Sequence, residues 1–431
     1  MESMDLEEIN ADLHLHGQFS SAVSADMVPS KIGEQAALKG LQLVGTADIL
    51  NNRWMQMVKG QLAAEGGNEG IFIHQNGTRF ILQTEIEDAM RVHHILLFPS
   101  LSKVQEVRER FASKCKDLDI EGRPKIHLNS AEIAAIAISA GCLIGPSHAF
   151  TPWTAMFKEY DSLEKCYGSN AKRISFIELG LSADTDMADR VSELSHVTFL
   201  SNSDAHSPWP NKMGREFTTL LMAEPSFEEL SKAIRRESGR RPTLNVKLNP
   251  KEGKYHRTRC MGCLTFFTLG DAMRLRWRCP ACGKPIKKGV LERIDELASS
   301  KEPVHPDHRP PCIHIIPLSE IIGLSLDVKN VYSAKVQEMW RLFIKRFGNE
   351  ITVLTVAPIP ELEGVNKKTA EMIRLFREDR FSYIPGGAGE YGVPVPPGKE
   401  AKMKVWDGAK VVIKDINSTV DSKQRPLSEF F

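Results

Sequence analysis

A chain of 431 residues is longer than one hydrophobic core usually supports, so we expect two or three domains. With 42% hydrophobic and 26% charged residues, the composition is that of an ordinary soluble globular protein. The sequence does not indicate a signal peptide, a membrane-spanning stretch or a disulfide framework. The first twelve residues are acidic, no run is long and apolar enough to span a bilayer, and eight cysteines are few for this length. We therefore expect a cytoplasmic enzyme.

The net charge of +1 conceals a strong asymmetry along the chain. Residues 232–288 contain sixteen Lys or Arg and three acids, a local net charge of +13, which leaves −12 for the remainder. A basic module on an otherwise acidic protein indicates a nucleic-acid footprint, and a basic surface without a partner is the alternative. The acidic remainder also suits carboxylates gathered around metal ions.

Short apolar runs alternate with helical patterns over residues 10–220, which is typical of an α/β domain. A helix is predicted at Ala131–Ser139, with a capping box formed by Asn129 and Glu132 and a stop at Gly141. The predicted strands are Ala11–His16, Leu43–Ala47, Arg79–Thr84, His94–Phe98, Leu143–Gly145, Phe176–Leu179 and Thr198–Ser201.

The first of these strands carries two histidines in an H-x-H pattern. Side chains alternate along a strand, so Asp12, His14 and His16 are expected on one face while Leu13 and Leu15 face a core. Two imidazoles that project together are a ready pair of metal ligands. The pattern alone is weak, and a surface strand with two histidines explains it equally well.

The other strands strengthen the metal interpretation, because five further apolar runs, six with the first, each have an acid or a histidine at one end. Such residues at successive strand ends are how an α/β barrel builds a site at one rim. Carboxylates and imidazoles around clustered divalent ions suit phosphoester hydrolysis. No nucleophilic triad, P-loop or dinucleotide-binding motif competes with this prediction. The residues concerned are Asp48, Glu85, Glu87, His93, His94, His148, Asp204 and His206.

In order, these motifs resemble those of the polymerase-and-histidinol-phosphatase (PHP) superfamily. The resemblance implies a distorted (β/α)7 barrel that holds two or three divalent metals (Zn²⁺, Mg²⁺ or Mn²⁺). It implies metal ligands at His14, His16, Glu85, His94, His148, Asp204 and His206, with Glu85 bridging two ions and Glu85, Asp204 and His206 as the catalytic groups. The family's second motif usually reads Thr-Asp-His; here Thr46-Ala47-Asp48-Ile49 lacks the histidine, and Asp48 is taken as a substitute ligand. We prefer His94 to His93 because the following Ile-Leu matches the motif register. Glu87 is assigned behind the ligands or beside the substrate.

A linker is predicted at Pro242–Lys254, followed by a module with two Cys-x-x-Cys pairs. Cys260 and Cys263 are separated by fifteen residues from Cys279 and Cys282, a spacing that indicates a structural Zn²⁺ in a zinc ribbon. Arginines interleaved with aromatic residues suit phosphate contacts and base stacking. The predicted DNA contacts are Arg274, Arg276, Arg278, Lys287 and Lys288.

A helical region follows. An amphipathic helix is predicted at Val331–Phe347, ending at Gly348, and a loop and helix at Pro358–Arg377. Residues 360–370 loosely match a helix-hairpin motif that binds a DNA phosphate through backbone amides. Ordinary helical packing explains the same residues equally well. Residues 385–397 are expected to be irregular, and Val405–Ile413 to form a terminal hairpin.

The last eight residues, 424–431, have the spacing of a sliding-clamp-binding peptide. Gln424 is followed three residues on by Leu427, and then by Phe430 and Phe431. On a helical turn the three apolar side chains would form one plug, as in helix-in-groove recognition. The alternative is a C-terminal segment that docks on its own core.

Over nearly its full length the chain resembles the endonuclease Q family, with expected domains at 1–243 (PHP nuclease), 244–320 (zinc ribbon), 321–400 (helical, DNA-binding) and 401–431 (hairpin and clamp-binding tail). The resemblance implies an archaeal-type, nucleoid-associated monomer. It would nick double-stranded DNA on the 5′ side of deaminated bases (uracil, hypoxanthine, xanthine) or abasic sites, flip the damaged nucleotide, and bind the sliding clamp (PCNA). The alternatives are a 3′–5′ exonuclease, a phosphoesterase on smaller substrates, and a non-catalytic zinc-dependent DNA scaffold.

Overall fold

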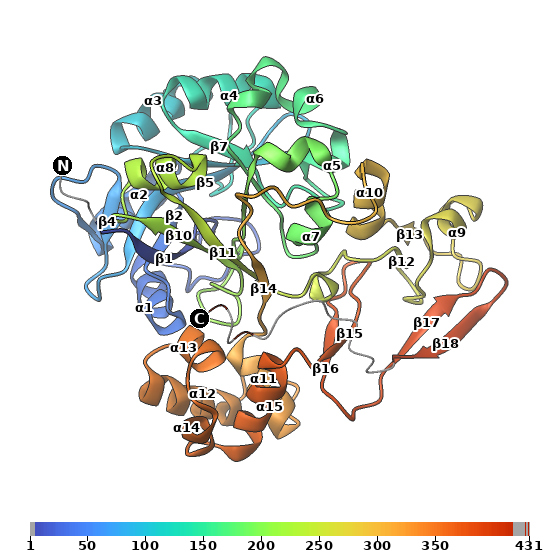
Figure 1. The fold of residues 1–431 in the computed structure, drawn as a ribbon. Coiled ribbons are helices and arrows are strands. Elements are labelled where there is room, and N and C mark those ends of the chain that lie inside the picture. The colour runs from blue at the N-terminus through green and yellow to red at the C-terminus, as the bar shows by residue number, and fades with distance from the viewer. Residues whose placement is uncertain (1–4, 417–426, 428–429, 431) are drawn as a thin grey trace.

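The computed structural model describes residues 5–416, 427 and 430, and its largest part is a mixed sheet covered by helices (Figure 1). The ten-stranded sheet has the order β14-β11-β10-β1-β2-β5-β4-β3, and β6 pairs with β5 and β7. Its strands are β1 (Glu7–Asp12), β2 (Leu43–Asp48), β3 (Ala63–Ala64), β4 (Ile71–Ile73), β5 (Arg79–Glu87), β6 (His93–Leu97), β7 (Leu143–Pro146), β10 (Phe217–Met222), β11 (Arg241–Lys247) and β14 (Cys312–His314).

The strands β8 (Phe176–Glu178) and β9 (Thr198–Leu200) form a separate parallel pair, so the described strands do not hydrogen-bond into the closed barrel that the sequence predicts. Both strands are only three residues long and offer few backbone groups for pairing. Side chains bridge the gap, because Phe176 and Leu200 belong to the same apolar cluster as Ala11, Leu43 and Ile95. The α/β class is confirmed, and six of the seven predicted strands are present with small shifts of their ends. The first prediction, Ala11–His16, shares only Ala11 and Asp12 with β1, so His14 and His16 follow that strand.

A second, larger apolar cluster lies between the sheet and its helices and continues to residues such as Ile322, Phe343 and Ile373 farther along the chain. The sheet helices are α1 (Pro29–Lys39), α2 (Asn52–Gln61), α3 (Leu101–Ala112), α4 (Ser130–Ser139), α5 (Met156–Glu159), α6 (Leu163–Tyr167), α7 (Thr185–Ala188) and α8 (Phe227–Arg235). The capping box of α4 is present as predicted, with Asn129 accepting from the Glu132 amide and Glu132 accepting from the Asn129 amide. The described helices include none that is long and apolar enough to cross a membrane.

The predicted linker is wrong over its first half. Residues 241–247 form β11, which pairs antiparallel with β10 and parallel with β14. A register shift between Thr219 and Leu220 places Pro242 opposite Leu220, which accommodates a residue that cannot donate to the ladder. The strand β14 comes from beyond the cysteine module, so the chain leaves the sheet, builds the module and returns to the same sheet.

The cysteine module contains β12 (Arg259–Cys260), α9 (Leu269–Arg274), β13 (Ile286–Lys287) and α10 (Val290–Leu297). The predicted terminal hairpin exists as β17 (Lys402–Trp406) and β18 (Val411–Asp415), and it packs on this module rather than standing apart (Figure 1). The Phe266 amide donates to the Lys404 carbonyl at 2.9 Å, and the Trp406 amide donates to the Phe266 carbonyl, also at 2.9 Å.

The helical region lies on another side of the sheet and consists of α11 (Leu318–Leu326), α12 (Ala334–Phe347), α13 (Glu350–Thr355), α14 (Ile359–Glu363) and α15 (Lys367–Arg377), followed by the hairpin of β15 (Ser382–Ile384) and β16 (Val393–Val395) (Figure 1). A buried ion pair joins this region to α1. Lys39 Nζ lies 2.7 Å from Glu350 Oε1, and both side chains are fully buried. Glu350 also accepts from the Trp340 indole and the Leu318 amide.

Candidate metal centre

Seven side chains gather at one rim of the sheet and form three overlapping groups whose ligand atoms lie close together. Glu85 belongs to two of the groups and His16 to two, so up to three ions would share ligands, as expected for Glu85 from the PHP motifs. The groups are His14, His16 and Glu85; His16, Asp204 and His206; and Glu85, His93 and His148.

The distances suit divalent ions. Two atoms that each lie about 2.1 Å from a tetrahedral ion are separated by about 3.4 Å. In the protein His14 Nε2 and Glu85 Oε1 are 3.5 Å apart, His16 Nε2 and Asp204 Oδ1 are 3.3 Å apart, and His148 Nε2 and Glu85 Oε1 are 3.3 Å apart. The buried Nε2 atoms of His14 and His16 have no hydrogen-bond partner. These two nitrogens face the carboxylates of Glu85 and Asp204, and such an arrangement fits a centre that holds more than one metal ion.

One ring nitrogen of each histidine contacts a neighbouring polar group of the protein. The other ring nitrogen is then available to bind an ion. His14 Nδ1 lies 2.8 Å from Glu178 Oε2, and His93 Nε2 lies 3.1 Å from Glu87 Oε2. His206 Nδ1 donates to the Asp204 carbonyl at 3.0 Å. Partners of this kind fix the tautomer and orientation of metal-binding imidazoles.

The structure groups His93, rather than the expected His94, with the other candidate ligand atoms. In the β5–β6 pairing His93 stands opposite Glu87, and His94 stands opposite Ile86. The two histidines therefore point to opposite faces of the sheet. His93 faces Glu85, whereas His94 turns to the helical layer, where its Nδ1 lies 2.8 Å from the Tyr167 hydroxyl and its Nε2 lies 3.3 Å from an Asp88 oxygen.

Asp48 lies beside the centre but outside its three ligand groups. Its Oδ2 accepts from the Gly17 amide at 2.7 Å and from the Ser20 hydroxyl at 2.9 Å. Its Oδ1 lies 3.4 Å from His16 Nδ1. The structure thus places Asp48 beside His16 and outside the three ligand groups, whereas the motif predicts a ligand.

Mutual contacts decide the ionisation of the buried ligands. Burial opposes the charged form of Glu85, but His93 and His14 outweigh it and hold the pKa of that carboxyl well below its usual range. Burial is likewise outweighed at Asp204, where a hydrogen bond with His16 is the leading favourable contribution and the pKa falls. The pKa of His14 rises well above its usual value despite burial, because of its carboxylate neighbours. The lowered pKa values of Glu85 and Asp204 favour ionised carboxylates, which are the form that binds a divalent ion.

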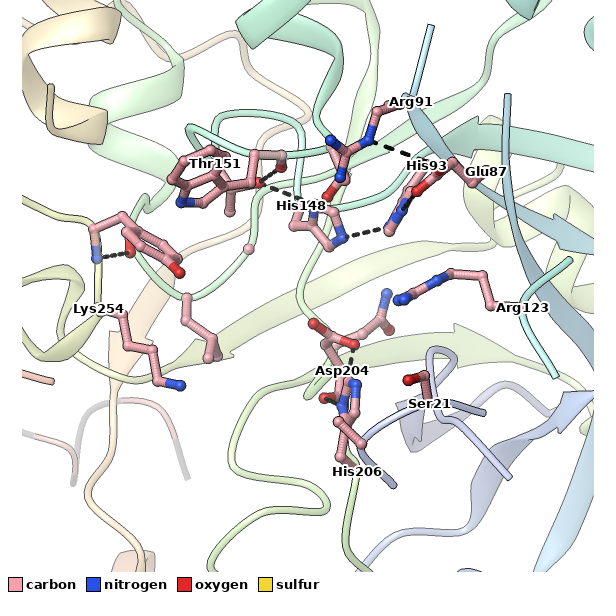
Figure 2. A pocket seen from close by; sticks show the side chains of 18 of the residues that line it. Ser21, Glu87, Arg91, His93, Arg123, His148, Thr151, Asp204, His206 and Lys254 are labelled. Atoms are coloured by element: carbon pink, nitrogen blue, oxygen red, sulfur yellow. Dashed lines mark hydrogen bonds and ion pairs between the residues drawn. The ribbon is translucent and has the colours of Figure 1, made fainter. Parts of the chain in front are cut away.

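A pocket of about 790 Å³ opens over the centre (Figure 2). Its lining includes Glu87, His93, His148, Asp204 and His206 together with several basic groups. Arg123 Nη1 donates to Glu85 Oε2 at 3.2 Å, so this guanidinium lies directly beside the ligands. The other basic and aromatic lining residues are Arg91, Lys125, Lys212, Arg215, Lys254, Trp153, Tyr255 and Tyr391.

The four predicted cysteine ligands are together. Cys260 Sγ lies 3.4 Å from Cys282 Sγ, and Cys263 Sγ lies 3.5 Å from Cys279 Sγ. Four thiols at these separations, with the Gly262 amide directed at Cys260 Sγ, match a closed tetrahedral site.

The predicted DNA contacts on this module differ in exposure. Arg274, Arg276 and Arg278 are exposed, and Arg274 forms an ion pair with Asp271. Lys287 and Lys288 are half-buried where the module meets the sheet domain.

In the C-terminal tail, Leu427 is fully buried in the large apolar cluster and Phe430 packs partly against it. This arrangement corresponds to the docked alternative for these two residues. Gln424 and Phe431 lie outside the described residues.

Sequence reasoning missed the groups that orient or surround the ligands. Glu178 is the most important, because its Oε1 accepts from the His148 amide at 3.0 Å while its Oε2 contacts His14. It stands at the end of β8, so the strand-end pattern that revealed the other acids would have found it. Arg123, Lys212 and Tyr391 lie in loops without any recognisable pattern.

Comparisons with known proteins agree with this geometry. Residues 317–380 match the family described as the MJ0043 C-terminal domain. The lesion-specific endonuclease PfuEndoQ from Pyrococcus furiosus is 45% identical with a TM-score of 0.86, covering 91% of this chain and 96% of that one. An endonuclease Q in complex with a 27-mer duplex that has an abasic lesion at the active site is 44% identical with a TM-score of 0.87, covering 91% and 97%.

The uncharacterized protein MJ0043 of Methanocaldococcus jannaschii is 48% identical over 250 residues, 57% of this chain, and the match spans 31% of that relative's length. The two solved structures, in contrast, align over nearly their whole length at more than 40% identity. This chain is therefore an enzyme of the endonuclease Q family.

Proposed function

We propose that this chain is a DNA repair endonuclease that hydrolyses the phosphodiester bond on the 5′ side of deaminated bases (uracil, hypoxanthine, xanthine) and abasic sites. The observation that carries the proposal is the set of three overlapping ligand groups beneath a basic pocket, in a chain 44% identical to an endonuclease Q bound to an abasic duplex. A cytoplasmic, nucleoid-associated monomer is part of this proposal.

The active-site ligands in the proposal are His14, His16, Glu85, His93, His148, Asp204 and His206. Two or three divalent ions (Zn²⁺, Mg²⁺ or Mn²⁺) bound here would lower the pKa of a water and neutralise charge that develops on the phosphate. The orphaned nitrogens of His14 and His16 support this assignment. We further infer that the strands around the site form a distorted PHP barrel, in which β8 and β9 close the wall by side-chain packing.

The residues of the pocket would position the substrate. Arg123 is half-buried and adjoins Glu85, so in the proposal it turns from that carboxylate to the scissile phosphate. Lys212 Nζ and Lys254 Nζ lie 5.2 and 4.7 Å from the centroid of the Tyr391 ring, and both would bind flanking phosphates. Trp153 and Tyr255 offer aromatic surface for a flipped base.

The cysteine module would hold a structural Zn²⁺ and bind the duplex through Arg274, Arg276 and Arg278. Their exposure and the +13 charge of residues 232–288 support a phosphate-binding surface. The tail would bind the sliding clamp. Because Leu427 is buried in the protein's own core, clamp binding in this proposal requires residues 424–431 to leave that site.

The proposal is tested with end-labelled duplexes that carry one uracil, hypoxanthine or abasic site, together with an undamaged control and Mg²⁺, Mn²⁺ or Zn²⁺. The expected product is a single nick 5′ of the lesion that disappears with a chelator. Asp204→Asn should abolish it, whereas Asp26→Asn, a change to an exposed carboxylate, should not. A ladder from the ends on every duplex would establish an exonuclease instead, and no cleavage would favour a phosphoesterase or a scaffold.

A further inference from the structure

A short turn, residues 148–154, separates two cavities. Thr151 lines both the 790 Å³ pocket above the metal centre and a second cavity of about 310 Å³. The second cavity is bordered by Lys287 of β13, so the turn lies between the ligands and the cysteine module. Figure 2 shows Thr151, His148 and His93 joined in series across the pocket.

The hydroxyl of Thr151 fixes the protonation pattern of the His148 ring. It donates its single proton to the Trp153 carbonyl at 2.8 Å. At its 3.2 Å contact with His148 Nδ1 the same oxygen must therefore accept, which requires the proton to sit on Nδ1. The lone pair of His148 is thereby placed on Nε2, the atom that lies 3.3 Å from Glu85 Oε1.

The turn is held from outside as well as by its own hydrogen bonds. His148 and Thr154 have positive φ angles, 29° and 51°, which are unfavourable for residues other than glycine. Lys287 Nζ lies 3.4 Å from the Trp153 ring centroid and donates to the Pro152 carbonyl at 3.4 Å. A conformation with two strained residues persists only where its surroundings determine it, and here those surroundings include the cysteine module.

We propose that Thr151 is a positioning residue for the metal ligand His148, and that Lys287 extends this positioning to the cysteine module. The module thus helps to build the metal centre besides offering a surface to DNA. The inference rests on the metal centre of the proposed function and does not depend on which substrate the enzyme cleaves.

The test is Mn²⁺ binding, without DNA, to protein that holds Zn²⁺ at the four cysteines only, followed by the electron paramagnetic resonance signal of free Mn²⁺. Loss of an orienting partner weakens metal affinity by roughly 10–100-fold, so Thr151→Val and Thr151→Ala should fall in this range. Thr151→Ser keeps the hydroxyl and should remain within about 2-fold of the parent. Mn²⁺ affinities of the folded Val or Ala variants equal to that of the parent would overturn the role of Thr151.

The second half of the inference is tested with Lys287→Met against Lys284→Met, an exposed lysine on the same module. Lys287→Met should weaken Mn²⁺ binding by about 3–10-fold, less than loss of the direct partner, while Lys284→Met leaves it unchanged. Equal Mn²⁺ affinities for the two variants would overturn the role of Lys287. A parent protein that binds Mn²⁺ but cleaves no damaged duplex would refute the proposed function alone, because this assay contains no DNA.

Discussion

The motif favours His94 as a metal ligand, whereas the structure places His93 among the candidate ligands. Variants of the two histidines can therefore decide between these assignments. His93→Asn removes an imidazole that lies 3.1 Å from Glu85 Oε1 and 3.3 Å from His148 Nε2. His94→Asn removes one that contacts Tyr167 and Asp88 in the helical layer. We expect the first change to act on metal binding and the second on folding.

The magnitudes follow from these contacts. Loss of an orienting partner alone costs roughly 10–100-fold in metal affinity, so loss of the ligand His93 should cost at least about 100-fold, or about 2.7 kcal/mol. His94→Asn should leave the Mn²⁺ affinity within about 2-fold, because its ring lies on the opposite face of β6. It should lower the free energy of unfolding by about 1–3 kcal/mol, the cost of leaving a buried polar partner unsatisfied.

Two measurements on both variants decide the matter: Mn²⁺ titration of the folded protein, and urea unfolding of the metal-free protein. The parent and a third variant, His127→Asn at an exposed position, serve as references. The reasoning is refuted if His94→Asn loses Mn²⁺ binding while His93→Asn retains it, since the motif register would then be right and the strand register wrong.

Three further predictions concern the rest of the chain. Lys39→Met should lower the free energy of unfolding by about 3 kcal/mol or more, because it leaves Glu350 charged and buried. Adding Glu350→Gln should restore part of that loss, and a double variant less stable than Lys39→Met would contradict this reasoning. Cys279→Ser should lower the melting temperature and the DNA affinity, and unchanged values would count against a structural zinc. Leu427→Ala should cost about 2–5 kcal/mol of stability if the leucine is docked as in the structure, whereas weaker clamp binding at unchanged stability would indicate a free peptide.

The parts that the sequence predicted well depend on local patterns. Apolar runs of four to six residues specify strands such as β2 and β7, and a polar residue at the end of a run lies at the rim whichever strands become neighbours. For this reason Glu85, His148 and Asp204 could be placed at one rim before the topology was known, and the structure groups them there with other candidate ligands. The capping box of α4 involves contacts within four residues and is equally local.

The errors concern contacts that are distant in the chain. Which of His93 and His94 faces inward depends on the register of β6 against β5, and a one-residue shift reverses every side chain. Residues 241–247 contain a proline and few apolar residues, and they form β11 only because β10 and β14 lie on either side. Tertiary pairing here outweighs a local sequence that favours a linker.

Local patterns and contacts between distant segments also have separate roles within the proposed metal centre, and the distant contacts determine how the candidate ligands are oriented. The proposed ligands lie at or just beyond strand ends, whereas the groups that contact their second nitrogens come from separate segments: Glu178 from β8 for His14, Glu87 from β5 for His93, and Thr151 from a turn for His148. An imidazole presents the correct nitrogen only if its outer partner is in place. Because the turn that carries Thr151 also contacts Lys287 of the cysteine module, a change in that module reaches the ligand set through one turn. We therefore expect variants that loosen the module to lose metal affinity as well as DNA affinity, which two independent domains would not do.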